Sequence, residues 1–159
     1  MDRFLSSAIN KVDKKGRVSI PASFRPVLGD GSRLYTLLSV DQPTIEAGGI
    51  GLIEKGEQYL AGLDPFSREY ELYSFVLHGD SGHLNVDGEG RIVLNDSLRD
   101  HAGIEDKVAF VGRGHFFQLW APDNFIRYRE EARANVAAMR RSGIGLAGDR
   151  STTDREQGN

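Results

Sequence analysis

Short runs of β-branched and other apolar residues, separated by Asp, Gly and Pro, cover most of the first 120 positions of the chain. Runs of this length and composition are typical of β-strands. The pattern predicts two matching sets of strands, at 5–12, 17–20, 33–38 and 51–54, and again at 83–86, 91–94, 107–111 and 116–120. A mostly β fold follows, with short helices between the strands.

The two sets of strands match because the chain contains one sequence pattern twice. Residues 13–29 and 87–103 align at a constant offset of 74 positions without a gap, and six of the 17 aligned positions are identical. The identical pairs are Asp13/Asp87, Gly16/Gly90, Arg17/Arg91, Ser23/Ser97, Arg25/Arg99 and Gly29/Gly103. An internal repeat of this kind predicts one small unit that is built twice and packed on itself.

Each repeat is expected to fold as a strand, a tight turn, a second strand and a short helix. Asp13 and Asp87 can accept hydrogen bonds from backbone N–H groups two residues on, and the Gly three residues later can adopt positive φ. This chemistry suits a hairpin closed by a type I turn and a bulge. Pro21 suits the first position of the helix, and Pro26 limits that helix to about one turn.

Two longer helices are predicted outside the repeats. Asp64 and Pro65 are typical of a helix start, and the apolar residues that follow share one helical face until His78 and Gly79 end the helix. A second helix begins after Pro122 and Asp123. The two apolar stripes consist of Phe66, Tyr70, Tyr73 and Leu77, and of Phe125, Tyr128, Ala132, Val136 and Met139.

These elements predict an α+β fold in which the two units pack into one pseudo-twofold, barrel-like domain. The expected divisions are a first repeat at 1–55, a helical linker at 56–80, a second repeat at 81–124, a C-terminal helix at 125–141 and a tail at 142–159. The tail is rich in Gly, Ser, Thr and charged residues. It is expected to be disordered, because it buries too little apolar surface to offset the entropy of ordering.

Composition narrows the class of protein. The chain has 159 residues and no Cys, which excludes a disulfide framework, thiolate chemistry and a sulfur-ligated metal site. It contains no run of about 18 apolar residues, so no membrane span is expected. Its first residues lack the long apolar stretch of a signal peptide. A cytoplasmic location is therefore expected.

Charge is distributed unevenly between the two repeats. The whole chain carries a net charge of −3, which argues against a surface that is basic throughout. Residues 13–29 nevertheless carry a net +3, and residues 87–103 carry a net −2. Arg3 and Lys11 add to the basic half. This asymmetry indicates a polyanionic partner for the first repeat.

The individual cations of the first turn differ in what they indicate. Lys14 and Lys15 have no basic counterpart in the second repeat, so they are functional candidates, although lysines at a hairpin tip are also ordinary surface residues. Arg17 and Arg91 persist although the surrounding charge changes sign. That persistence favours a shared structural role, such as an ion pair with the Asp of the same turn. From the residues alone, the role of Arg17 stays open.

Enzymatic signatures are weak. His78 and His83 bracket a Gly-rich segment, but a turn leaving a helix is favoured there because no third metal ligand is evident. The glycines at 48–51 and 112–114 resemble phosphate loops only superficially, and both are predicted to be hairpin turns that open no helix. Trp120 and the two Phe residues of the same strand are expected to pack in the core. No enzymatic activity, metal or cofactor is expected.

The turn Asp-x-x-Gly-Arg, followed by an apolar strand, Pro and a short helix with Arg, resembles the AbrB-like DNA-binding unit. Two such units joined by a helical linker resemble the MraZ family of bacterial transcriptional regulators, over about residues 1–135. The matching segments are Asp87-x-x-Gly-Arg-Ile, Leu98-Arg99-x-His-Ala-Gly-Ile104, Val111-Gly112-x-Gly114 and Phe117-Gln-Leu-Trp120, together with Met1-Asp-Arg-Phe-Leu and Leu38-Ser-Val-Asp41. The second repeat departs from the pattern at Asn95, where Pro is usual.

The resemblance implies a cytoplasmic, nucleoid-associated regulator of the gene cluster for cell division and cell-wall synthesis. It also implies a closed homo-oligomeric ring that binds tandem repeats in double-stranded promoter DNA. The DNA-contacting turn falls on Asp13, Lys14, Lys15, Gly16 and Arg17, to which the charge pattern adds Lys11. A secondary contact falls on Gly90 and Arg91, where Gly88 and Glu89 replace basic residues.

Two classes of function stay open at this stage. The first is a sequence-specific DNA-binding regulator. The second is an oligomeric interaction protein that lacks specific DNA binding and whose partners do the regulating.

Overall fold

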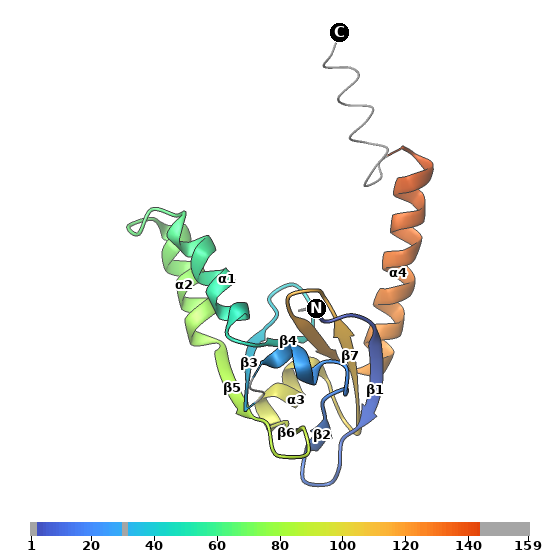
Figure 1. Ribbon diagram of the computed structural model, residues 1–159. Coiled ribbons are helices and arrows are strands. Elements are labelled where there is room, and N and C mark those ends of the chain that lie inside the picture. The colour runs from blue at the N-terminus through green and yellow to red at the C-terminus, as the bar shows by residue number, and fades with distance from the viewer. Residues whose placement is uncertain (1–2, 30–31, 144–159) are drawn as a thin grey trace. The chain divides into compact units, whose positions relative to one another are not determined.

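The computed structural model describes residues 3–29 and 32–143, and the chain forms two compact units, Met1–Pro122 and Asp123–Asn159. The first unit contains an antiparallel sheet with short helices, which confirms the α+β class (Figure 1). Its elements in chain order are β1 (Ser7–Lys11), β2 (Arg17–Ser19), the 3-10 helix η1 (Arg25–Leu28), β3 (Arg33–Leu38), β4 (Ile45–Gly48), α1 (Gly51–Ala61), α2 (Arg68–Gly79), β5 (Ser81–Asn85), β6 (Arg91–Val93), α3 (Asp96–Ala102), β7 (Lys107–Gly112) and β8 (Phe117–Trp120). Helix α4 (Pro122–Arg141) follows.

The sheets are built by exchange of strands between the two repeats. Six strands form one sheet in the order β1-β7-β8-β4-β3-β5, and β2 pairs with β6 in a separate two-stranded ribbon. Replacing every strand by its counterpart in the other repeat (β1 by β5, β3 by β7, β4 by β8) returns the same order read backwards. The topology therefore has the pseudo-twofold symmetry that the sequence repeat predicts.

The hairpins predicted within the two repeats are wrong in their strand pairing. The tight turns form where they were expected, but the strands that flank each turn do not pair with one another. Strand β1 pairs with β7, and β2 pairs with β6, with Val18 opposite Ile92. Both of these side chains are buried. Crossed pairing buries apolar residues of both repeats in one shared core, which a local hairpin cannot do.

Aromatic residues from distant parts of the chain fill the centre of this core. The rings of Phe4, Phe24 and Phe117 contact one another at centroid distances of 4.9 to 5.4 Å. Equivalent backbone bonds fasten the two halves together, because Val12 N donates to Asp106 O at 2.8 Å and Val86 N donates to Ser32 O at 3.1 Å. Trp120 is buried as predicted.

The short helices end at the predicted glycines, but η1 begins at Arg25 and not at the predicted Pro21. In the second repeat, Asn95 is the N-cap of α3, and its side chain accepts a hydrogen bond from Leu98 N at 2.9 Å. Asn therefore starts this helix well in place of Pro. Gly103 ends α3 in the left-handed conformation, and Gly29 ends η1 with φ of 75°.

The region between the repeats holds two helices rather than a strand and one helix. The strand predicted at 51–54 is the first turn of α1, and the strand before it is β4. The second helix begins at Arg68 with Ser67 as its N-cap, not directly after Asp64. Leu77 is buried against Gly56 of α1. Phe66, the first residue of the predicted stripe, lies before α2 and is 96% exposed, and Tyr73 is 52% exposed.

Helix α4, at Pro122–Arg141, contains the helix predicted at 125–141 and begins three residues earlier. The tail predicted at 142–159 lies outside the described residues except for Ser142 and Gly143. Within residues 3–29 and 32–143, every helix is too short or too polar to cross a membrane.

Candidate nucleic-acid interface

The first turn, residues 13–17, is organised around one carboxylate. Asp13 Oδ1 accepts hydrogen bonds from the backbone N–H groups of Lys15 at 2.9 Å and Arg17 at 2.8 Å. Its Oδ2 pairs with Arg17 Nε at 2.7 Å. The Asp residue thus fixes both the backbone of the turn and the base of the arginine head group. The ion pair that the sequence repeat indicated for Arg17 is confirmed.

The second turn, residues 87–91, repeats this geometry. Asp87 Oδ1 accepts from Glu89 N and Arg91 N, each at 2.9 Å, and Oδ2 pairs with Arg91 Nε at 2.9 Å. Each turn is also closed by a hydrogen bond from the glycine N–H to the Asp carbonyl at 3.0 Å. Because the same atoms are used in both places, the Asp–Arg pair belongs to the scaffold of the turn and does not by itself distinguish a binding turn.

The turn glycines are required by backbone geometry. Gly16 has φ of 81° and Gly90 has φ of 77°, which is the left-handed region. Each glycine carbonyl accepts a hydrogen bond from the other repeat, from Leu94 N to Gly16 O at 2.8 Å and from Ile20 N to Gly90 O at 2.9 Å. The two turns are therefore held in register by the β2–β6 ribbon and project from the same end of the first unit (Figure 1).

The pKa values of the turn carboxylates reflect this arrangement. The backbone N–H of Arg17, with help from its side chain, holds the pKa of Asp13 below its usual value, and Arg91 does the same for Asp87. The hydrogen bond from Asp87 raises the pKa of Arg91, and the charges of Glu89 and Asp13 add to the effect. Both Asp residues are therefore ionised at neutral pH, and Arg91 stays charged.

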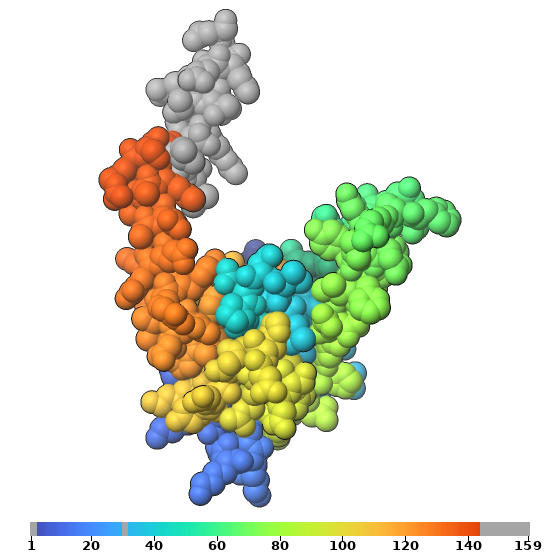
Figure 2. All heavy atoms as spheres, turned by 180° about the vertical axis from the view of Figure 1, so that it is seen from behind, coloured from blue at the N-terminus to red at the C-terminus, as the bar shows by residue number. Residues whose placement is uncertain are grey.

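The basic residues predicted from the sequence lie together around the first turn. Lys11, Lys14 and Lys15 are exposed, and Figure 2 shows the first turn, in blue, projecting from the body of the unit. Residues 13–17 carry three cations against Asp13, a net charge of +2. The structure adds Lys107, which is the register partner of Lys11 in the β1–β7 pair. Sequence reasoning missed Lys107, because only strand pairing brings it to the turn.

The second turn is close to the first but different in charge. Residues 87–91 carry Asp87 and Glu89 against Arg91, a net charge of −1. Glu89 Oε2 lies 3.5 Å from Arg91 Nη1, so this guanidinium has two carboxylates beside it. Within the described residues, Arg17 pairs only with Asp13 and only through Nε, which leaves its Nη groups without a protein hydrogen bond.

Arg25 is a second repeated arginine with a structural contact at the site. Its Nε donates to Ile20 O at 3.1 Å, and a Cβ on Gly90 would lie 2.3 Å from that same Nε. Arg25 therefore packs directly against the second turn. Its counterpart Arg99 instead donates to the backbone carbonyls of Ile104 and Glu105 after α3. The repeat had singled out both residues without indicating these different contacts.

The alternative chemistries have little support in the fold. The glycines at 48–51 were predicted to form a hairpin turn and not to open a helix, which is wrong, because they lead from β4 into α1. The loop at 112–114 does join two paired strands, β7 and β8. His78 lies in the last turn of α2 and His83 lies on β5. Across the described part of the chain, no three His, Asp or Glu residues form a cluster that could hold a metal ion.

Comparisons with known proteins indicate the family to which the chain belongs. Residues 79–144 match the family model described as "MraZ protein, putative antitoxin-like". The chain is 48% identical over 143 residues to the transcriptional regulator MraZ of Methylocella silvestris and 47% identical over 143 residues to that of Beijerinckia indica, in each case covering 89% of this chain and 87% of the relative. It is 46% identical over 135 residues to the transcriptional regulator MraZ of Rickettsia bellii, covering 83% of this chain and 90% of the relative. On these similarities the chain belongs to the MraZ family.

Proposed function

We propose that this protein is a sequence-specific DNA-binding transcriptional regulator whose reading element is the first turn. The observation that supports this most is the difference between the two turn arginines. Asp13 holds Arg17 at Nε only, at 2.7 Å, and exposed lysines flank it at 14 and 15, whereas Nη1 of Arg91 lies beside Glu89. A positioned guanidinium beside exposed lysines suits a polyanionic partner, because the lysines attract it and the guanidinium can recognise it.

Each cation of the turn has a distinct proposed role. The Nη groups of Arg17 can donate to O6 and N7 of guanine in the major groove. Lys11, Lys14 and Lys15 would neutralise backbone phosphates, and Gly16 would allow the close approach of the backbone. Gly90 and Arg91 would make a secondary contact. Each phosphate that is neutralised releases counterions, so affinity should fall steeply with salt.

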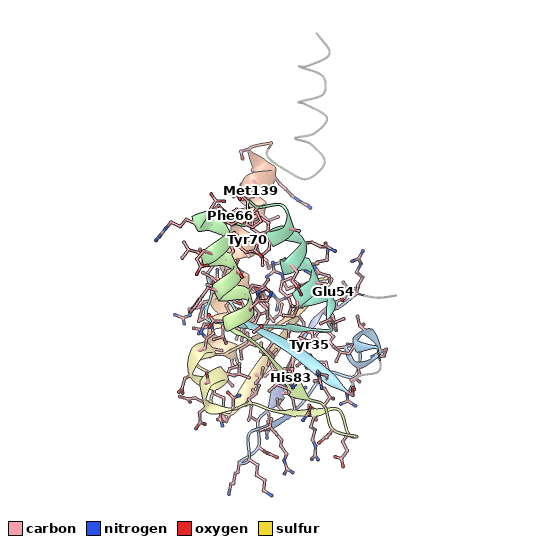
Figure 3. All side chains as sticks on the ribbon, turned by 90° about the vertical axis from the view of Figure 1, so that its left-hand side faces the viewer. Tyr35, Glu54, Phe66, Tyr70, His83 and Met139 are labelled. Atoms are coloured by element: carbon pink, nitrogen blue, oxygen red, sulfur yellow. The ribbon has the colours of Figure 1, made fainter. Side chains whose placement is uncertain are left out.

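One turn offers too few contacts for useful affinity, so we propose that several act together. A head-to-tail interface that closes into a ring would display many turns, and tandem DNA repeats would engage them at once. Exposed apolar side chains on the α1–α2 hairpin support a contact with a second copy, and Figure 3 places Phe66 at its far end. The residues that are more than half exposed there are Tyr59, Phe66, Leu72, Tyr73 and Phe75.

The proposed biological setting rests on the resemblance to the MraZ family. We propose that the protein acts in the cytoplasm on the nucleoid. Its target there would be the promoter of the gene cluster for cell division and cell-wall synthesis.

Fluorescence anisotropy tests the proposal. The assembled protein is titrated into a duplex from upstream of its own gene and into a scrambled duplex of equal length, across a salt series. The wild type should prefer the upstream duplex. Lys14→Ala/Lys15→Ala should lower affinity for both duplexes and reduce the salt slope by roughly two, at about 0.9 per phosphate. Arg17→Ala should remove the preference for the upstream duplex.

A charge-matched control makes the result specific. Arg129→Ala/Arg133→Ala removes two exposed cations from α4 and should leave affinity and salt slope unchanged. Equal binding of both duplexes by the wild type would contradict sequence-specific recognition. An assembled protein that binds neither duplex would favour the second class of function, an oligomeric interaction protein, to which the exposed hairpin residues are suited.

A further inference from the structure

We propose that Glu89 is a specificity-determining residue that weakens phosphate contacts at the second turn and so confines DNA reading to Arg17. This inference rests on the proposed function. It concerns the residue at which the two otherwise equivalent turns differ most in charge.

The first step is that both turns face the same surface. The β2–β6 register places Arg17 opposite Val93 and Arg91 opposite Ser19, so the two arginines lie on neighbouring strands of one short ribbon. The reciprocal bonds to the carbonyls of Gly16 and Gly90 fix the turns side by side. A DNA backbone that approaches Arg17 therefore also approaches the second turn.

The second step is the exchange of charge at equivalent positions. Lys15 corresponds to Glu89 at the repeat offset, and Lys14 corresponds to Gly88. The side chain of Glu89 is 75% exposed, so it can meet an incoming phosphate. A carboxylate in this place repels the phosphate that a lysine would attract.

The third step is that the two turn arginines differ in the number of carboxylates beside them. Arg91 contacts Asp87 through Nε and Glu89 through Nη1, whereas Arg17 contacts Asp13 alone among the described residues. Two carboxylates of its own turn thus lie beside the charged guanidinium of Arg91. Its Nη1 is drawn toward Glu89 and is less available to a base edge.

The expected effect of Glu89 is a higher ratio of specific to nonspecific DNA affinity, and not a higher affinity. Phosphate contacts carry no sequence information, and they raise the affinity for every duplex alike. A basic second turn could also hold a duplex by phosphate contacts alone, in complexes in which Arg17 reads no base. Such complexes would add the same amount of binding to every duplex, so weakening them raises the ratio of specific to nonspecific affinity. A repulsive group that works against the wrong partner is a recognised route to specificity.

The test compares Glu89→Lys and Glu89→Gln with Glu131→Lys, which makes the same charge change at an exposed position of α4. Binding to the upstream and scrambled duplexes is measured by anisotropy across a salt series. Glu89→Lys should bind the scrambled duplex several-fold more tightly, steepen the salt slope by about 0.9 for one added phosphate contact, and reduce the ratio of the two affinities. Glu89→Gln should change each quantity in the same direction by less.

The opposing result is equally clear. If Glu89→Lys and Glu131→Lys give the same affinities and salt slopes, the second turn does not face the DNA and the inference is overturned. Failure of the proposed function would be seen in the wild type alone, as equal binding of both duplexes. Thermal unfolding followed by circular dichroism confirms that the variants are folded.

Discussion

Glu46 and Gln118 face each other as register partners in the β4–β8 pair, at the middle of the six-stranded sheet. They are also counterparts in the two repeats, so the pseudo-twofold axis passes between them. Gln118 Oε1 accepts hydrogen bonds from Arg113 Nη1 at 2.9 Å and from Trp120 Nε1 at 3.1 Å. Glu46 accepts a hydrogen bond from Ser39 Oγ at 3.3 Å. The junction of the repeats is therefore polar, although apolar strands surround it.

Stability should depend on the charge of Glu46. Burial raises the pKa of this carboxyl above its usual 4.5, against the opposing effects of Ser39 and Arg113. A raised pKa in the folded state means that the contribution of the protonated group is fully present below pH 4.5 and is lost as pH rises through the folded pKa. Glu46→Gln should therefore raise the free energy of unfolding at pH 7, and this gain should vanish near pH 4. Urea unfolding at the two pH values checks this, and an equal gain at both would contradict it.

The Asp–Arg pair of the first turn should matter for binding and for acid stability. Because the folded pKa of Asp13 is lowered, its contribution to stability is present above pH 3.8 and is lost as pH falls through the folded pKa. Asp13→Asn should reduce the acid dependence of unfolding. It should also weaken binding of the upstream duplex, because the amide cannot accept from Arg17 Nε at the Oδ2 position. Asp87→Asn should change acid stability similarly and weaken that binding less than Asp13→Asn does, because Arg91 makes only the secondary contact, as anisotropy and acid titration would show.

Backbone geometry makes Gly16 sensitive to substitution. Its φ is 81°, and a Cβ there would lie 3.0 Å from Leu94 O. Gly16→Ala should lower the free energy of unfolding by roughly 1–2 kcal/mol, the usual cost of an L-residue in the left-handed region. Gly49→Ala is the matched control, because among the described residues other than its chain neighbours no atom lies within 4 Å of an added Cβ, and its φ is not positive. Urea unfolding of the two variants should differ by that amount, and equal stability would show that the turn relaxes.

Substitution of an exposed aromatic residue should affect assembly, whereas substitution of a buried one should affect folding stability. Phe66 is 96% exposed, so Phe66→Ser should leave unfolding stability within about 0.5 kcal/mol but reduce the size of the assembly in sedimentation velocity. Phe117 is fully buried, and Phe117→Ala should cost about 3–5 kcal/mol of stability. A normal assembly in Phe66→Ser would remove the hairpin tip from the subunit contact.

Much of the site could be predicted from the sequence because its chemistry is local. Asp13, Gly16 and Arg17 lie within five consecutive positions, so the carboxylate reaches the N–H groups and the guanidinium without help from distant residues. The same holds for the ends of the short helices at Gly29 and Gly103. The strand predicted at 33–38 also matches β3, since its apolar run and flanking turns are read along the chain.

The tertiary structure alone decided which strands meet and which faces are buried. Strand β1 pairs with β7 of the other repeat, which brings Lys107 beside Lys11. The strand predicted at 51–54 is helical, because β4 takes the position beside β8 in the sheet. Phe66 continues an apolar helical pattern yet meets no core. Local sequence determined the turns because their donors and acceptors are neighbours in the chain. Strand partners and burial depend on how the two repeats cover each other's apolar surface. The free energy gained by that burial arises only when both repeats are folded together, so no local stretch of sequence determines it.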